Sequence, residues 1–371
     1  MAKIPYFIPD ISTKEIGAVN KVLCSRWISA GNILSECERK FEKKLNVNKY
    51  HCVGVSSGYS ALYLSMLLAG IKKNDIVLMP NINFVASMNA AKQLNAKIKL
   101  VDSESKFNPN ISINDLKKKL SSKVKAIIVM HYGGYPCDMH ELLKLKKKYN
   151  FILIEDSCHA IFSKYQGKTL GSFGDFSAFS FYANKNITSG EGGMLYCKKA
   201  KDVKRAKLLK NHGLNTNSFL HKNQSFHAKY DIKETGFNFR LDDLRASLLS
   251  TQLDNIEKKN KIRYKIFLEY KKNLKKNKKI KILFSEYSTN EYSRHLFVIK
   301  TNFKKLLEKK LKKNGISYSC HYKPISYLSA YKTKEKYPNS KNLFKTIISL
   351  PIYPKLTKNK ISKICDIINS I

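Results

Sequence analysis

The sequence predicts an α/β protein with a mostly parallel central sheet, followed by a smaller α+β domain at the C-terminus. Two observations predict it. Between about residues 51 and 200, short apolar runs alternate with helical patterns. These runs are continuous rather than alternating with polar residues, which is typical of parallel strands buried on both faces. A charged helical stretch then leads into a region of mixed strand and helix patterns, so the 371 residues form two to three domains.

The expected elements follow in order along the chain. In the first region we expect strands over residues 52–55, 76–79, 126–130 and 151–154, and helices over 61–68, 85–94 and 139–149. Beyond it we expect a helical connector over 242–274, a strand over 295–299, and helices over 304–314 and 357–370. The predicted division is an N-terminal segment (1–30) packed on the small domain, a large domain (31–250) and a small domain (251–371).

Composition excludes several classes of protein. A hydrophobic content of 43% excludes wholesale disorder, and no run approaches the roughly 18 apolar residues of a membrane span. The first five residues contain no apolar leader, so we expect a soluble cytoplasmic protein. The eight cysteines include no C-x-x-C pair, so we expect neither a zinc site nor a disulfide framework, and no metal.

The net charge of +41 raises the question of a nucleic-acid or membrane-surface partner. Only seven of the 69 basic residues are arginine, whose planar fork suits phosphate and base recognition. The lysines are scattered over predicted helix faces, as at 117–119 and 146–148. We therefore expect neither partner; nucleic-acid binding is an alternative that rests on charge alone.

Polar residues follow several of the predicted strands, at the sheet edge where α/β proteins bind ligands. Ser57 and Gly58 begin a predicted helix, where backbone N–H groups can hold an anion; an ordinary helix cap would look the same. Asp156 and His159 follow the strand at 151–154. An aspartate can keep a basic ring nitrogen protonated, although a helix cap and a packed histidine would also explain this pair.

Lys185 follows an aromatic-rich run of about ten residues that has no other charge. Desolvation there would lower its pKa and free the amine for covalent chemistry. A solvated surface lysine before a simple hairpin at Gly190–Gly193 is the alternative. Asn238 and Arg240 begin the connector and could cap a helix or bind an anion.

In this order and spacing, these segments resemble the DegT/DnrJ/StrS sugar-aminotransferase family, which has the aspartate aminotransferase fold and uses pyridoxal 5'-phosphate (PLP). The resemblance runs nearly end to end. The further segments that carry it are residues 26–31 (RWISAG), 82–87 (INFVAS), 131–134 (HYGG), 210–213 (KNHG) and 350–354 (LPIYP).

The resemblance implies a role for each matching residue. Lys185 would bind the cofactor covalently and move a proton between the cofactor and the substrate carbon. Asp156 would hold the proton of the pyridinium nitrogen, Phe84 would stack on the ring, and His159 would lie near the phenolic oxygen.

The phosphate would be held by Ser57, Gly58, Ser180 and the residue at 59. That residue is Tyr59, where the family commonly has a small threonine, so one hydroxyl contact is in doubt. Asn238 matches an asparagine that reaches the phosphate of the neighbouring subunit, which implies a homodimer with shared sites.

The motifs are most similar to those of GDP-perosamine synthase-like enzymes, which aminate C4 of a nucleotide-linked 4-keto-6-deoxyhexose. Amino transfer from glutamate, in surface polysaccharide, lipopolysaccharide O-antigen or glycan synthesis, is therefore the expected function. Some relatives carry histidine in place of the lysine and dehydrate the sugar, so Lys185 favours transamination. Transfer to C3, or a PLP-binding regulatory protein without turnover, are the alternatives. We expect the substrate on loops 26–32, 182–188 and 317–326.

Overall fold

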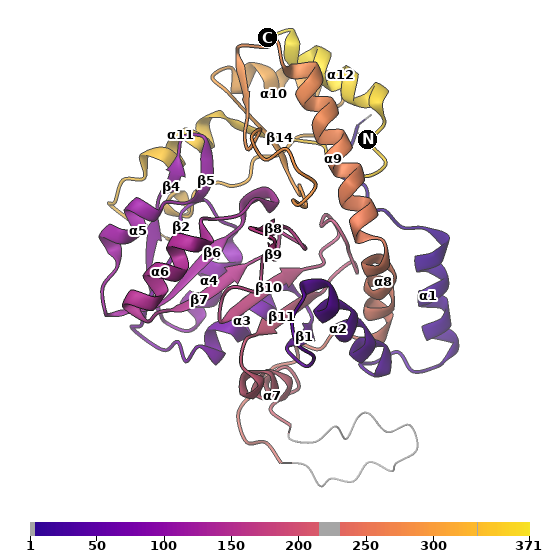
Figure 1. Ribbon diagram of the computed structural model, residues 1–371, viewed down its shortest axis with the longest axis vertical. Helices are drawn as coiled ribbons and strands as arrows, with labels where there is room; N and C mark the ends of the chain where they lie inside the picture. The colour runs from indigo at the N-terminus through magenta and orange to yellow at the C-terminus, as the bar shows by residue number, and fades with distance from the viewer. Residues whose placement is uncertain (1–3, 215–230, 332) are drawn as a thin grey trace.

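The computed structural model describes residues 4–214, 231–331 and 333–371, and it confirms the predicted α/β class (Figure 1). A seven-stranded sheet forms the larger part. Its strands, in spatial order, are β1 (Cys52–Val55), β11 (Gly193–Cys197), β10 (Phe176–Ser180), β7 (Ile152–Asp156), β6 (Val124–Met130), β2 (Ile76–Pro80) and β3 (Lys97–Val101). The five strands from β10 to β3 are parallel, whereas β11 is antiparallel to both of its neighbours.

Continuous apolar runs cover both faces of this sheet because successive side chains of a strand point to opposite sides. In β2, Val77 and Met79 join the core that includes α3 and α4, whereas Leu78 joins the core beneath α5 and α6. The helices of this part are α2 (Asn32–Leu45), α3 (Gly58–Leu68), α4 (Val85–Gln93), α5 (Ile113–Lys119), α6 (Met139–Tyr149), α7 (Ala200–Leu209) and α8 (Asp243–Asp254). Two short hairpins complete it: β4 (Ser103–Ser105) with β5 (Asn108–Ile111), and β8 (Lys164–Tyr165) with β9 (Lys168–Thr169).

The predicted connector is two helices rather than one. It breaks at Asn255, between α8 and α9 (Ile256–Leu274), and the longer α9 runs into the smaller part (Figure 1). That part contains β12 (Ile280–Ile282), β13 (Phe297–Thr301), α10 (Lys304–Lys313), α11 (Pro338–Thr346), β14 (Ile347–Leu350) and α12 (Lys358–Asn369). Its three strands form an antiparallel sheet in the order β12–β13–β14.

The N-terminal segment contacts both parts. Ile4 bridges to Ile316 and lies in the core of the small sheet. α1 (Thr13–Cys24) begins with Ser12 in a capping box and packs on α8 instead. The segment at 1–30 therefore lies along the small sheet only at its beginning, and a domain boundary at residue 250, inside α8, stays a prediction.

The observed elements differ from the predicted ones mainly at their ends. β7 runs to Asp156, and α3 begins at Gly58 rather than at residue 61. β3 was not expected, because its lysines interrupt the apolar pattern at the sheet edge. None of the helices in the described parts of the chain combines the length and the apolar character needed to cross a membrane.

Candidate active site

The site-forming segments meet where β7 and β10 end beside the first turn of α3. Gly58 lies so close to this edge that a Cβ atom there would be 2.8 Å from Ser180 Cβ and 3.1 Å from Cys158 Sγ. Any larger residue at 58 would push the helix off the sheet. A small cavity at this edge is lined by His159, Ser180 and Lys185. The sequence-predicted residues Gly58, His159, Ser180 and Lys185 are thus brought together.

The first turn of α3 presents hydroxyl and backbone donors at this edge. Ser57 is the N-cap, and its Oγ accepts a hydrogen bond from the backbone N–H of Ser60 at 3.0 Å. The hydroxyls of Ser57 and Ser60 lie 2.9 Å apart and share a hydrogen bond. Because the N-terminus of a helix also carries partial positive charge, this turn suits an anion.

Asp156 and Lys185 are the charged groups of the site. Asp156 is 3% exposed, and burial raises its pKa, although the Cys158 N–H at 3.2 Å and the charge of Lys185 act in the opposite direction. Burial also lowers the pKa of Lys185. A buried carboxylate of this kind is stabilised by a cationic partner, and a lysine of this kind has more of its amine in the reactive free form.

His159 is buried and held as a neutral ring. Its Nδ1 accepts a hydrogen bond from the backbone N–H of Gly133 at 3.3 Å, so Nε2 carries the hydrogen and lies 2.8 Å from the Tyr322 hydroxyl. Burial and the charge of Lys185 lower the pKa of His159 well below its ordinary value. The histidine therefore acts as a hydrogen-bond donor here, not as a second cation.

Two rings face this site from different parts of the chain. Phe84 caps α4 without a side-chain bond, is 53% exposed, and lies 5.7 Å from the ring of Tyr322. Tyr322 also stacks on His159 at 5.8 Å. Tyr59, by contrast, bonds through its hydroxyl to Gln93 Oε1 at 2.5 Å. A contact from residue 59 to an anion would therefore use its backbone N–H.

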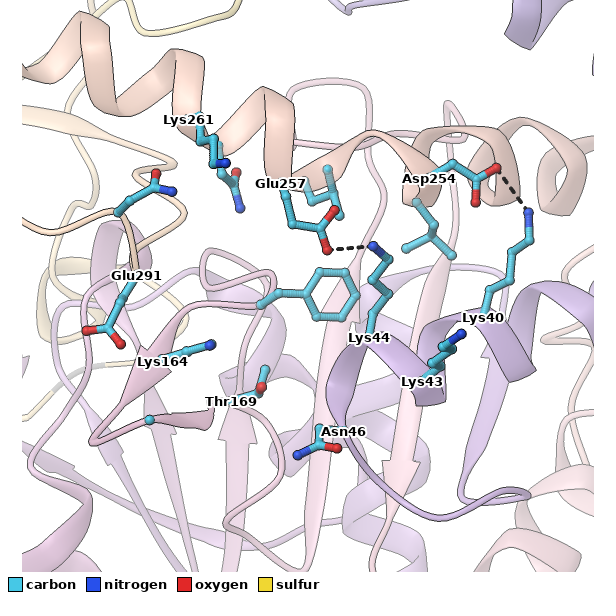
Figure 2. Close-up of a pocket in the computed structure, with 16 residues that line it drawn as sticks. Lys40, Lys43, Lys44, Asn46, Lys164, Thr169, Asp254, Glu257, Lys261 and Glu291 are labelled. Carbon is cyan, nitrogen blue, oxygen red and sulfur yellow. Dashed lines mark hydrogen bonds and ion pairs between the residues drawn. The ribbon is translucent and has the colours of Figure 1, made fainter.

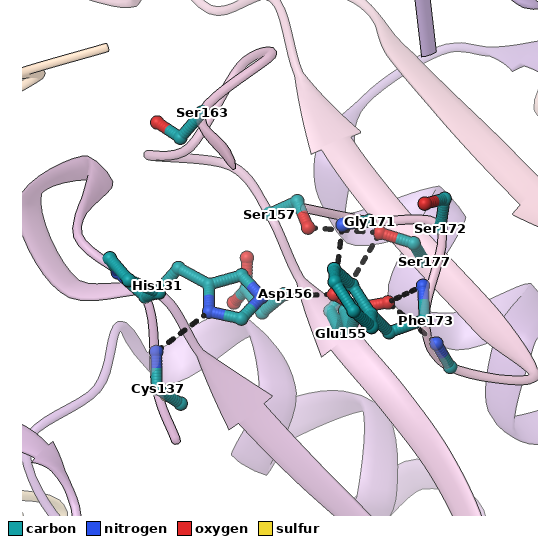
Figure 3. Close-up of polar contacts among 12 residues, drawn as sticks. His131, Cys137, Glu155, Asp156, Ser157, Ser163, Gly171, Ser172, Phe173 and Ser177 are labelled. Carbon is teal, nitrogen blue, oxygen red and sulfur yellow. Dashed lines mark hydrogen bonds and ion pairs between the residues drawn. The ribbon is translucent and has the colours of Figure 1, made fainter. Parts of the chain in front are cut away.

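Glu155 was given no role in the sequence analysis. In the structure its carboxylate holds the loops beneath the site (Figure 3). It is fully buried, and its two oxygens accept bonds from the backbone N–H groups of Gly171, Phe173 and Gly174 at 2.6–2.8 Å. Its Oε2 also lies 3.0 Å from His131 Nε2. The backbone N–H of Cys137 donates to His131 Nδ1 at 3.2 Å, so Nε2 carries the hydrogen given to Glu155. Glu155 is therefore a structural carboxylate, unlike its neighbour Asp156.

The smaller part of the protein supplies residues that the sequence did not single out. Tyr322, His295 and His321 come from it. Burial lowers the pKa values of both histidines, and the positive charge of Lys185 lowers them further. Tyr322 and His321 do lie in the loop 317–326 that we expected to touch substrate. Nothing in the sequence marked His295 as a site residue, because it is only the first residue of the predicted apolar strand at 295–299.

Asn238 lies on an edge segment rather than inside this cluster. The backbone of that segment pairs with β1: Ser56 N–H donates to Phe239 C=O at 2.9 Å. Asn238 itself is exposed. Its side chain has no hydrogen-bond partner among the residues that the structure describes. The Asn238 side chain is therefore exposed at a position that a second chain could reach.

A separate cavity of about 950 Å³ lies between α2, the α8–α9 junction and the β8–β9 hairpin (Figure 2). Lysines from α2 cross it to acids of the helix junction: Lys40 Nζ lies 3.1 Å from Asp254, and Lys44 Nζ 2.5 Å from Glu257. These exposed pairs contribute little stability individually. The cavity holds none of the predicted site residues, and in the described ranges no cluster of His, Cys, Asp and Glu could hold a metal ion.

Comparison with known proteins identifies relatives along the whole chain. The model of the DegT/DnrJ/EryC1/StrS aminotransferase family matches residues 9–369. GDP-perosamine synthase of Escherichia coli O157:H7 is 32% identical over 375 residues, covering 100% of this chain and 98% of that protein. The UDP-4-amino-4,6-dideoxy-N-acetyl-beta-L-altrosamine transaminase of Campylobacter jejuni (subsp. jejuni serotype O:23/36, strain 81-176) is 32% identical over 382 residues, covering 99% and 97%.

Solved structures agree with this relationship. Helicobacter pylori PseC, an aminotransferase involved in the biosynthesis of pseudoaminic acid, superimposes with a TM-score of 0.90 at 27% identity, covering 98% of both chains. The PLP form of Spr1654 from Streptococcus pneumoniae gives a TM-score of 0.90 at 28% identity, covering 99% of this chain and 98% of that one.

Proposed function

This chain belongs to the DegT/DnrJ/EryC1/StrS aminotransferase family, and from that premise we propose that it transfers an amino group from glutamate to C4 of a nucleotide-linked 4-keto-6-deoxyhexose. The enzyme is a PLP-dependent sugar aminotransferase. The position of transfer and the amino donor are the proposed part. Surface polysaccharide or glycan synthesis is the proposed setting.

The residues at the site suit PLP, because they would offer an amine for covalent attachment, a carboxylate for the ring nitrogen and N–H and hydroxyl groups for the phosphate. Lys185 provides an amine with a lowered pKa for covalent attachment, and Asp156 a buried carboxylate that gains from a cationic ring nitrogen. The phosphate would be held where α3 comes close to β10. The residues at this place are Ser57, Gly58, the backbone of Tyr59, and Ser180. When bound, the cofactor supplies an electron sink for the carbon that loses or gains the amino group.

The side chains then have separable tasks. Lys185 Nζ would take and return the proton at the reacting carbon, and burial favours this role because it lowers the pKa of the amine. Asp156 would hold the proton on the ring nitrogen. His159 would lie near the phenolic oxygen, and Phe84 would cover the ring.

Amination at C4 is supported by the named relatives. The Campylobacter relative is named for a 4-amino-4,6-dideoxy sugar, and it is 32% identical to this chain end to end. The identity of Lys185 favours amino transfer over dehydration.

The test is to incubate the purified enzyme with glutamate and a panel of GDP-, UDP-, dTDP- and CDP-linked keto-sugars, and to identify the product by mass and NMR. We expect a 4-amino-4,6-dideoxyhexose product and 2-oxoglutarate. A 3-amino product would show that the enzyme aminates C3 rather than C4. Turnover only with an amino donor other than glutamate would contradict the proposed donor.

We also propose a homodimer in which Asn238 completes the phosphate site of the second subunit. Its exposure and lack of a partner among the described residues support this assignment.

Mixing the inactive variants Lys185→Ala and Asn238→Asp, after mild denaturation and refolding, should restore turnover. Hybrid dimers carry both defects in one site and leave the other wild type, so up to half of the hybrid sites recover. The aspartate weakens cofactor binding because its charge opposes the phosphate. Hybrid formation is checked with differently tagged chains; verified hybrids without turnover would place the action of Asn238 within its own subunit.

A further inference from the structure

The loop that carries Lys185 joins β10 to β11 and is fastened at two points to the connector helices. Asn186, directly after the lysine, is 5% exposed, and its Nδ2 donates to Ser293 C=O at 2.6 Å and to Asn260 Oδ1 at 3.2 Å. Further along, the backbone N–H of Thr188 donates to Gln252 Oε1 at 2.9 Å. Gln252 belongs to α8 and Asn260 to α9, so both helices hold this loop.

The remaining polar atom of Asn186 is also engaged. Its Oδ1 lies 3.2 Å from Nδ1 of His295. An amide oxygen only accepts, so the hydrogen of the His295 ring is on Nδ1. Burial and the neighbouring His159 and Lys185 lower the pKa of His295 well below its ordinary value, which keeps this ring neutral. The amide of Asn186 therefore contacts two separate segments, α9 at Asn260 and the segment that contains Ser293 and His295.

Lys185 has no comparable anchor of its own. Within the described ranges, no hydrogen bond or ion pair is made by its Nζ, and its backbone N–H donates to Tyr182 C=O at 2.9 Å within the same turn. The place of the amine is consequently set by the backbone of the loop. The strongest side-chain restraint on that backbone next to the lysine is Asn186.

We propose that Asn186 is a positioning residue, which fixes the Lys185 amine beside Asp156 by fastening the loop to Ser293, Asn260 and His295. The proposal rests on the proposed role of Lys185 but not on the identity of the sugar. Truncation of this side chain removes the fastening and leaves the Ser293 carbonyl without a buried donor. The loop then moves outward, and the exposure of the amine to water increases.

The first measurement uses the cofactor-free protein. Competitive acetylation across a pH range, read by mass spectrometry on the peptide that contains residue 185, gives the apparent pKa of Lys185. Because burial lowers this pKa in the native protein, we expect Asn186→Ala to raise it toward the ordinary lysine value, so that labelling at neutral pH falls several-fold. In the holoenzyme we expect kcat to fall about 10- to 100-fold with the sugar KM within about threefold, the pattern of a misplaced catalytic group.

Thr188→Val is the matched control, since it is a buried, nearly isosteric change in the same loop. It removes the bond that Thr188 Oγ1 donates to Phe181 C=O and the bond that it accepts from Gly190 N–H, both at 2.9 Å, but leaves every contact of Asn186 in place. We expect it to reduce the stability of the fold without changing the labelling of Lys185. Asn260→Ala removes only one acceptor of the Asn186 amide, so it should shift the labelling in the same direction as Asn186→Ala by a smaller amount. If Asn186→Ala does not fold, Asn260→Ala is measured in its place.

Unchanged Lys185 labelling in folded Asn186→Ala, or equal shifts in Asn186→Ala and Thr188→Val, would overturn the proposal. If the wild-type enzyme aminates none of the sugars but Asn186→Ala still shifts the labelling of Lys185, the positioning role is supported and the proposed substrate is wrong.

Discussion

Lys185→Ala should lose amino transfer by about 10³-fold or more, because the variant lacks both the covalent attachment of the cofactor and the amine that moves the proton. Burial lowers the pKa of this lysine, and the strand that precedes it, β10, contains no charged residue. Treatment of the wild-type holoenzyme with borohydride, followed by peptide mapping, should attach the cofactor at residue 185. The variant should show no such adduct and no yellow absorbance from a bound imine.

Lys146→Met is the matched control for that experiment. Lys146 belongs to α6, which packs on the same sheet, and its Nζ lies 2.6 Å from Asp175 at the opposite ends of β7 and β10. Its loss should lower the free energy of unfolding and leave the borohydride adduct unchanged. An adduct at any lysine other than Lys185 would contradict the assignment of the site.

Asp156→Asn should reduce kcat by about 10²–10³-fold, or roughly 3–4 kcal/mol of transition-state stabilisation. The substitution keeps the shape of the buried side chain but removes the charge that would hold the proton on the cofactor nitrogen. Binding of the cofactor should weaken less than turnover, because the phosphate contacts at α3 and β10 are untouched. Titration with PLP by fluorescence and steady-state kinetics separate the two effects.

Asp175→Asn controls for the loss of an aspartate charge near the same strands, at a partly buried position. Asp175 accepts from Leu153 N–H at 2.8 Å and pairs with Lys146, so its replacement should cost stability. It lies at the far ends of the strands from the site and should leave kcat within about twofold. Normal transamination by Asp156→Asn would show that another group holds the ring proton.

The large sheet was predictable because its strands are buried on both faces. Apolar residues such as Val77, Leu78 and Met79 are needed on each side, so the pattern is local and visible in the chain. The antiparallel direction of β11 was expected only under the alternative of a hairpin at Gly190–Gly193, since apolar composition does not record strand direction. The break at Asn255 was also missed, because the helical pattern continues through it on both sides.

The site divides in the same way. Lys185, Asp156 and Gly58 were predictable because each lies within a few residues of a strand end, where the order of strand, turn and helix determines the position of a side chain. Their roles came from the family resemblance. Tyr322 was expected only as part of the loop 317–326, and His295 and Asn260 were not expected. Each lies more than 70 residues from Lys185, so its contact with the site depends on tertiary packing.

The sequence by itself determined the α/β class, the family and the lysine–aspartate pair, because these depend on local patterns and on short motifs in a set order. The tertiary structure decided which groups surround that pair, and how. Glu155 and Asp156 are adjacent carboxylates, but folding surrounds Glu155 with three backbone N–H donors and His131, whereas Asp156 receives one from Cys158. Hydrogen bonds between distant segments separate the structural acid from the proposed catalytic one, and no local pattern in the chain encodes that difference.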